Sequence, residues 1–362
     1  MLAAADVRID GDRPWDVRVH NNDIYERVVA EGMLGVGEGY MDGWWDCDQL
    51  DEMINRAFQA GFHRDIRPLS YFLFTLDARL RNLQNRVRSL QVGREHYDLG
   101  DDLYSAMLDK RMQYSCAYWK DADNLEDAQR NKLDLIARKL QLKSGMRVLD
   151  IGCGWGGALQ YFTEQYGVEG VGVTISAEQQ RSAEKRCAGL PVKILLQDYR
   201  ELSGQFDSIY SVGMFEHVGH KNYRIYMETV RRLLTPDGLS LLHTIGSPVS
   251  QVRADPWFTR YIFPNSSLPS PSHITAAAEG VLNMEDWHNF PQDYERTLLA
   301  WYDNFESNWP ELEKNYDNRF FRMWRYYLLA VAGGFRAGGN QLWQIVFSKD
   351  GCKGGYNANN IR

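Results

Sequence analysis

The chain has 362 residues, of which 44% are hydrophobic, so it is long enough to bury a large core and to form two domains of unequal size. Its formal net charge of -7 argues against a general nucleic-acid-binding protein, which would need a basic surface. The sequence reaches Asp6 before any apolar signal segment can form, and no apolar run approaches the roughly 18 residues of a membrane span. We therefore expect a cytoplasmic protein that does not bind nucleic acid.

The cysteine spacing argues against a metal site. The five cysteines show no CxxC or CxxH spacing, so they predict neither a zinc site nor a disulfide framework. Aromatic residues make up 13% of the chain, and most of them are expected in a core. A site that handles a cation or a lipid chain would also need aromatic side chains.

The first part of the chain is predicted to precede the catalytic domain. We expect a small N-terminal domain over residues 1–62, suited to lipid or membrane docking, and an amphipathic linker helix over residues 63–94. Apolar residues recur at helical spacing from Leu69 to Leu90. Residues 64–94 also hold seven arginines and two aspartates, a local net charge of +5. The helix either packs its apolar stripe on the main domain with its arginines in solvent, which the sequence modestly favours, or meets anionic phospholipid.

Strands alternate with helices in the third region, residues 95–362. This alternation predicts an α/β fold with a doubly wound parallel sheet. Ligands bind such sheets at the carboxyl ends of the strands. The expected strands cover residues 146–151, 168–174, 192–196, 206–212 and 239–245, and the expected helices cover 158–166, 176–187 and a segment after Lys221.

A glycine-rich loop follows the first of these strands. Gly152, Gly154 and Gly157 form a GxGxxG pattern between a strand and a helix, which is typical of nucleotide binding. A nicotinamide site also needs an acid about 20 residues further on, and Thr174 stands at that strand end instead. An oxidoreductase is therefore disfavoured. Asp198 follows the third strand, where it could accept a hydrogen bond from an adenine amino group, so the pattern fits S-adenosylmethionine.

Polar side chains also follow the later strands. Glu216 and His217 come after the fourth strand, and His243 lies at the end of the fifth. A single histidine at such an edge is more often structural. Two histidines and a glutamate on adjacent strand ends indicate a site.

Ten motifs taken together resemble a known enzyme family. They include "MQYSCAYW", "VLDIGCGWGG", "GMFEHVG", "LLHTIGS" and "EDWHNF", and they run along nearly the whole chain. In this order they resemble the bacterial cyclopropane-fatty-acyl-phospholipid synthases and, more distantly, the mycolic acid cyclopropane synthases. The resemblance implies a class I S-adenosylmethionine-dependent methyltransferase fold with a small N-terminal domain.

The resemblance also implies the residues of the site. The S-adenosylmethionine contacts are carried over to Tyr114, Ser115, Gly152, Gly154, Gly156, Thr174, Gln179, Gln197 and Asp198. Of these, Gln179 could replace the absent ribose-binding acid. A bound bicarbonate is implied to be held by Cys116, Glu216, His243, Ile245 through its backbone, and Tyr302.

The implied reaction adds the methyl group of S-adenosylmethionine across a cis double bond of a phospholipid acyl chain. Loss of a proton to bicarbonate then closes the cyclopropane. The intermediate is a carbocation, so we expect a dry, aromatic wall around it. The candidates are Tyr302 and Tyr261 first, then Tyr114, Tyr118, Trp119, Phe215, Phe263 and Trp301.

The resemblance further implies a homodimer that associates peripherally with the inner face of the membrane, where its unsaturated phospholipid substrate lies. Two other functions stay open at this point. One is a conventional methyltransferase that leaves a methyl group on a lipid, amine or phenol. The other is a lipid-binding protein without activity, which would need damage at the glycine loop, Glu216 or His243, and the sequence shows none.

Overall fold

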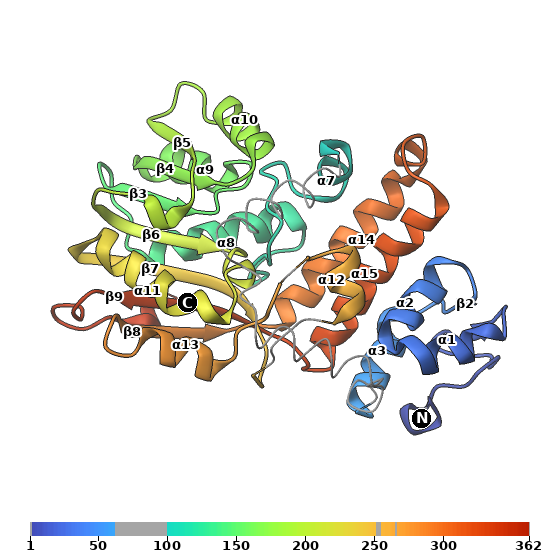
Figure 1. Ribbon diagram of the computed structural model, residues 1–362. Helices are drawn as coiled ribbons and strands as arrows, with labels where there is room; N and C mark the ends of the chain where they lie inside the picture. Colours follow the sequence, from blue (N-terminus) through green and yellow to red (C-terminus); the bar gives the residue numbers. More distant parts are fainter. Residues whose placement is uncertain (1, 62–99, 251–254, 265, 362) are drawn as a thin grey trace.

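The computed structural model describes residues 2–61, 100–250, 255–264 and 266–361 (Figure 1). A β-sheet with helices on both faces forms one half of the molecule, and a group of helices that includes the N-terminal region forms the other. The predicted linker helix over residues 63–94, with its arginine-rich face, lies outside the described residues.

The central sheet confirms the predicted α/β class and corrects one detail. The described residues contribute seven strands, in the order β5-β4-β3-β6-β7-β9-β8. The first five in this order are parallel, whereas β9 runs antiparallel between β7 and β8. The sheet is therefore mixed. The expected strands included neither β8 nor β9. The strand β8 is an edge strand with mostly polar, partly exposed residues and so lacks a clear pattern, whereas β9 is mostly apolar and almost wholly buried. The strands are β3 (Arg147–Ile151), β4 (Glu169–Thr174), β5 (Val192–Leu196), β6 (Phe206–Val212), β7 (Leu234–Gly246), β8 (Asn283–Asn289) and β9 (Gln341–Ser348).

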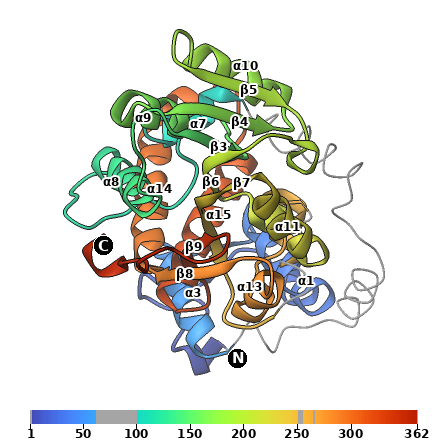
Figure 2. The same ribbon diagram turned by 90° about the vertical axis from the view of Figure 1, so that its left-hand side faces the viewer.

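Alternate residues of β3 serve the two faces of the sheet. Val148 packs with α8 and α9, whereas Leu149 and Ile151 pack in the core that includes α11 and α13. Asp150 therefore points to the same face as Val148, toward α8. Figure 2 shows α8 and α9 on one side of the sheet and α11 and α13 on the other. The helices around the sheet are α7 (Asp101–Met107), α8 (Leu125–Lys139), α9 (Gly157–Tyr166), α10 (Ala177–Arg186), α11 (Tyr223–Leu233), α12 (Pro256–Tyr261) and α13 (Pro271–Ala278), and short 3₁₀ turns cover Tyr199–Glu201, Phe215–His217, His220–Asn222 and Ala358–Asn360.

The N-terminal region packs against two long helices near the C-terminus. Tyr40, Trp45 and Leu50 share one hydrophobic core with Trp324 and Leu328 of α15. The described N-terminal residues therefore do not form a core of their own, and their expected division from the rest at residue 62 stays a prediction. The elements concerned are a 3₁₀ turn at Leu2–Ala5, β1 (Arg18–Val19), α1 (Asp23–Glu31), α2 (Met33–Met41), β2 (Trp45–Asp46), α3 (Leu50–Gln59), α14 (Gln292–Leu312) and α15 (Asn318–Arg336).

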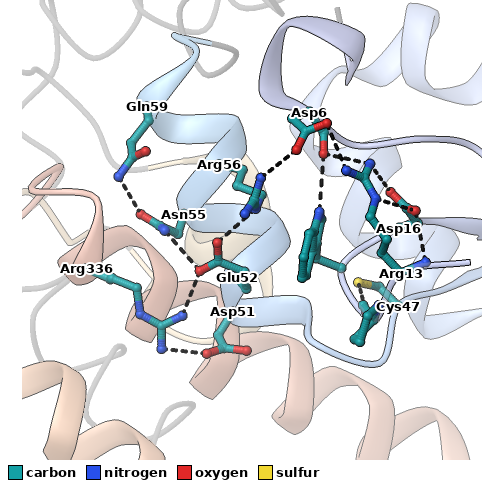
Figure 3. Close-up of polar contacts among 12 residues, drawn as sticks. Asp6, Arg13, Asp16, Cys47, Asp51, Glu52, Asn55, Arg56, Gln59 and Arg336 are labelled. Carbon is teal, nitrogen blue, oxygen red and sulfur yellow. Dashed lines mark hydrogen bonds and ion pairs between the residues drawn. The ribbon is translucent and has the colours of Figure 1, made fainter. Parts of the chain in front are cut away.

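A charged junction at the end of α15 joins α3 to this helix pair (Figure 3). Arg336 binds Asp51 at 2.6 Å and Glu52 at 3.2 Å, both on α3, and Glu295 of α14 at 2.7 Å. Glu52 continues the network to Arg56 at 2.8 Å. Because one guanidinium serves three half-buried carboxylates, the junction fixes α3, α14 and α15 relative to one another.

Within the part of the chain that is described, no helix combines the length and the apolarity that crossing a membrane requires.

Replacing Arg336 by methionine should destabilise the protein. Three carboxylates would lose their shared partner, so we expect the free energy of unfolding to fall by roughly 2–4 kcal/mol. The matched control is Arg18→Met, because Arg18 pairs with Asp48 in an exposed bridge, and this change should cost about 0–1 kcal/mol. Urea denaturation of both variants measures the difference, and equal losses would contradict the role given to Arg336.

Candidate active site

A pocket of about 220 Å³ lies at the carboxyl edge of the sheet, between the glycine loop and residues 112–115. It brings together most of the residues expected to bind the cofactor. Those that line it are Tyr114, Ser115, Gly152, Gly154, Thr174, Gln179, Gln197 and Asp198. The predicted set therefore converges on one cavity, as the carboxyl edge of parallel strands predicts.

The glycine loop needs its glycines for two different reasons. Gly152 has a φ of +89°, and a Cβ there would lie 2.8 Å from Met214 Cγ, so a side chain would both strain the backbone and crowd the pocket. Gly156 does not line the pocket. It caps α9 with a φ of +78°, and a Cβ would lie 3.0 Å from Ala183 Cβ. Its role here is to start the helix closely packed on α10.

Asp150 is a pocket residue that the sequence analysis did not assign. It ends the apolar stretch of β3, lines the pocket and is 3% exposed. Burial raises the pKa of Asp150 to about 7, against the opposing effects of the Tyr210 hydroxyl and Lys132. The available signal was its position, two residues before the first glycine of the loop.

Polar groups at the ends of β4 and β5 form one side of the pocket. The Thr174 hydroxyl donates to Gln179 Oε1 at 2.9 Å, so the amide of Gln179 is held at the end of β4. The carboxylate of Asp198 accepts from Arg200 Nε at 2.8 Å and from the Arg200 backbone N–H at 3.0 Å. An adenine amino group would therefore share Asp198 with Arg200.

A second, buried cluster adjoins this pocket at the end of β7. The Ile245 N–H donates to Glu216 Oε1 at 2.8 Å, and His243 points from the same face of the strand. Ser115 and His217 line the pocket, and the next residues toward the interior, Cys116 and Glu216, belong to the cluster. At two places, therefore, a residue of the pocket and a residue of the cluster are direct neighbours in the sequence.

The titration states of the cluster follow from its burial. Burial raises the pKa of Glu216 to about 7, opposed by the Ile245 N–H. Burial also holds the pKa of the Cys116 thiol well above its usual range and the pKa of His243 well below it. Gln344 Nε2 lies 3.2 Å from His243 Nδ1 and can only donate, so the single imidazole proton lies on Nε2. The cluster therefore offers neutral donors rather than a thiolate or an imidazolium.

Three polar atoms of this cluster have no hydrogen-bond partner among the described residues. They are Glu216 Oε2, His243 Nε2 and the indole nitrogen of Trp301, and all three are buried. Buried polar groups are normally paired, because leaving one unpaired costs about 1–3 kcal/mol. A polar ligand with donor and acceptor oxygens is the kind of group that pairs with such atoms.

Tyr302 does not join this cluster, which corrects the expectation for it. Its hydroxyl donates to Glu306, and Arg325 Nε donates to it at 3.3 Å. Arg325 in turn contacts Tyr40 of the N-terminal region. Tyr294, which lies eight residues earlier on the same helix, is the tyrosine near the cluster.

Tyr294 is buried, and Tyr327, Cys116 and Glu216 lie close enough to influence its phenol electrostatically. The eight helical steps from Tyr294 to Tyr302 correspond to about 12 Å. Both tyrosines lie in an aromatic stretch of one amphipathic helix, so the sequence offered no clear signal to choose between them. Burial raises the pKa of Tyr294 well above its usual range, so it stays a phenol and can donate.

Some of the expected aromatic wall is present beside the pocket. The Tyr114 ring lies 5.2 Å from Trp301 and 6.5 Å from Phe263, and its hydroxyl donates to that of Tyr327 at 2.8 Å. Two other candidates lie elsewhere. Tyr261 donates to Glu38 of α2 at 2.7 Å, and Phe215 stacks on Tyr223 in the core of the opposite sheet face, 4.1 Å between ring centres.

Comparison with known proteins assigns residues 84–345, which include both the pocket and the cluster, to the family described as mycolic acid cyclopropane synthetase. The chain belongs to this family. It is 57% identical over 352 residues to a cyclopropane-fatty-acyl-phospholipid synthase of Escherichia coli K12, covering 96% of this chain and 92% of that protein. The family model thus covers residues 84–345, and the similarity to the E. coli protein extends over nearly the whole chain.

One further relative and one solved structure are also similar to this chain. A probable fatty acid methyltransferase of Pseudomonas putida is 38% identical over 268 residues, covering 70% of this chain and 68% of that protein. The crystal structure of mycolic acid cyclopropane synthase CmaA1 complexed with SAH and CTAB superposes with a TM-score of 0.67 and 31% identity, covering 72% of this chain and 98% of that chain. The fold is thus that of a class I S-adenosylmethionine-dependent methyltransferase.

Glu216 should make the stability of the protein depend on pH. Its pKa is about 7 when folded and 4.5 ordinarily, so the folded state holds more protons than the unfolded state between these values. Stability is then lost as the pH rises from about 4.5 to about 7, by roughly 3 kcal/mol, and stays lower above pH 7.

Glu216→Gln keeps an acceptor for the Ile245 N–H and removes the titration. We expect the variant to gain stability relative to the wild type as the pH rises through this range, measured by urea denaturation at several pH values. A stability difference that stays constant with pH would show that Glu216 does not titrate in this way.

Proposed function

We propose that this protein is a cyclopropane-fatty-acyl-phospholipid synthase that uses S-adenosylmethionine. The observation that carries the proposal is the similarity to the E. coli enzyme over 96% of the chain, together with a pocket and a cluster in which the matching polar residues converge. The reaction would transfer a methyl group from the sulfonium to one carbon of a cis double bond. Loss of a proton from that methyl group and closure of the ring then give the cyclopropane, with S-adenosylhomocysteine as the other product.

The pocket suits the donor substrate. Gly152 lets the backbone approach the ligand, and Gln179 and Gln197 present amides at the β4 and β5 ends for the nucleoside. Tyr114 and Ser115 close the side nearest the cluster. This orientation would hold the sulfonium near the cluster, where proximity to the alkene lowers the barrier.

The cluster suits bicarbonate as the group that removes the proton. Its unpaired buried atoms are an imidazole N–H, an indole N–H and a carboxyl oxygen, and the Tyr294 phenol adds another donor. Such donors in a dry site stabilise a small oxyanion strongly. Bicarbonate bound there would supply the base for the added methyl group. Cys116 and Glu216, both uncharged at the lower end of the physiological pH range, would not repel it.

The aromatic residues would protect the carbocation. Tyr114, Trp301 and Phe263 lie beside the pocket and offer ring faces rather than nucleophiles. Ring faces stabilise a positive charge, and a wall without water prevents its capture. We include in the proposal that the enzyme is a homodimer, as the family resemblance implies. We also include that it works at the inner face of the membrane, because the substrate chain lies in the bilayer.

The alternative is a methyltransferase of the same fold that leaves a methyl group on the acyl chain. The likeness to the P. putida protein, called a probable fatty acid methyltransferase, favours keeping it. The two functions differ in the product. Cyclopropanation adds one CH₂ and leaves no alkene that hydrogenation can reduce under mild conditions, whereas a retained methylene or double bond can be reduced.

The direct test incubates the full chain with vesicles of cis-unsaturated phospholipid and S-adenosylmethionine, with bicarbonate present or removed. We expect acyl chains heavier by one CH₂ and resistant to mild hydrogenation, and turnover that falls when bicarbonate is removed. Products that still take up hydrogen would favour the alternative, and turnover that does not respond to bicarbonate would contradict its role as base.

Tyr294→Phe should slow turnover on the order of a hundredfold, because the proposed bicarbonate loses one hydrogen-bond donor. Tyr302→Phe is the matched control on the same helix and should leave turnover within a few-fold of the wild type. The measurement is kcat with saturating vesicles, alongside the affinity for S-adenosylhomocysteine, which neither change should alter much. A larger loss for Tyr302→Phe would restore the first assignment from sequence.

A further inference from the structure

Helix α8 carries two lysines that are fully buried. Lys132 and Lys139 are both 0% exposed, although buried lysines are rare. Lys139 pairs with Asp286 at 3.6 Å and lies 3.2 Å from His288 Nδ1, next to β8. Lys132 lies about two turns earlier on nearly the same face of α8 and has a different set of partners.

The ammonium of Lys132 binds two residues of the segment that forms the pocket wall. It donates to Gln113 Oε1 at 2.8 Å and to Ser115 Oγ at 2.9 Å. Asp109 and Asp150 influence it electrostatically, but among the described residues no carboxylate oxygen lies within 4.0 Å of it. A buried cation without a carboxylate in contact is costly, so its position calls for a function.

The contact with Ser115 fixes the direction of one hydroxyl hydrogen. An ammonium can only donate, so Ser115 Oγ must accept from it. The single hydrogen of the hydroxyl is then turned away from Lys132. Ser115 lines the cofactor pocket, so this hydrogen is available to an acceptor there.

The neighbouring contact works in the same way. Gln113 Oε1 accepts from Lys132, which turns the amide nitrogen toward the Arg111 carbonyl at 3.3 Å. The side chain of Gln129, also on α8, donates to the backbone carbonyls of Gln113 and Ser115 at 3.2 and 2.9 Å. In these four hydrogen bonds α8 supplies every donor, and residues 113 and 115 supply every acceptor.

The position of Ser115 indicates which part of the cofactor it meets. Ser115 lies next to Cys116 and close to Gly213 at the end of β6, whereas Gln197 and Asp198 follow β5 at the other side of the sheet, where a nucleoside fits. S-adenosylmethionine has one anionic group, its carboxylate. A hydroxyl polarised by a buried ammonium prefers an anionic acceptor, and the nearby positive charge adds attraction where water is excluded.

We propose that Lys132 is a positioning residue that fixes Ser115 as a hydrogen-bond donor to the carboxylate of S-adenosylmethionine. This inference rests on the proposed use of that cofactor. Burial lowers the pKa of Lys132 to about 8, so the ammonium is retained at neutral pH.

The test compares two ligands that differ in the amino acid end, which carries the carboxylate. S-adenosylhomocysteine carries the amino acid end of the cofactor, and methylthioadenosine has the same nucleoside and thioether without it. Calorimetry on the full chain should show that Lys132→Met weakens S-adenosylhomocysteine binding about tenfold or more, with methylthioadenosine binding unchanged. Equal losses for both ligands would indicate a purely structural lysine and overturn the proposal, as would no loss for either.

Lys139→Met is the matched control, because it removes an equally buried lysine from the same helix. It should lower the melting temperature to a similar degree but preserve the ratio of the two affinities. If Lys132→Met does not fold, Lys132→Gln, which keeps one donor, replaces it in the same comparison.

A double-mutant cycle tests the route through Ser115. Once Ser115→Ala has removed the hydroxyl, Lys132→Met should weaken S-adenosylhomocysteine binding little further. Two fully additive losses would overturn the proposed route. A wild-type chain that binds neither S-adenosylhomocysteine nor S-adenosylmethionine would instead contradict the proposed function, so the two failures are distinguishable.

Discussion

The hydrogen bond from the Ile245 N–H to Glu216 ties the turn that follows β6 to the end of β7. It occupies one carboxyl oxygen and leaves the other, Oε2, buried without a hydrogen-bond partner among the described residues. Burial keeps the Cys116 thiol and the His243 imidazole uncharged at neutral pH, and it raises the pKa of Glu216 to about 7, so this carboxyl group is partly protonated there. The site can therefore concentrate donors around a small anion without placing a strong nucleophile next to a reactive cation.

Much of the site could be predicted from the sequence because its signals are local. The glycine loop, the strand ends and the motifs around Cys116, Glu216 and His243 each lie within a few residues, and the carboxyl edge of the sheet gathers them. The resemblance pointed to Tyr302 and not to Tyr294, because both lie in the same aromatic helix and only packing decides which one lies near Cys116. Patterns in one chain do not contain that orientation.

Two other features escaped for related reasons. Lys132 reads as a solvent-facing residue in a polar helix, "LEDAQRNKLDLIARK", and its burial depends on the wall that residues 113–115 build across it. The strand β8 is polar because it is an edge strand, so it lacks the apolar run that marks β3 or β6. The α/β class could still be predicted, because the five parallel strands alone define the sheet edge at which ligands bind.

Two neighbouring residues of helix α14 contact different parts of the molecule. Tyr294 faces the buried cluster, and Glu295 binds Arg336, which also holds Asp51 and Glu52 of the N-terminal region. A chimaera that exchanges the first 61 residues between relatives would therefore have to inherit matching acids on α3, or it would shift the helix that aims the phenol. The beginning of the chain is in this sense not an exchangeable accessory but a part of the same inherited unit as the reaction centre.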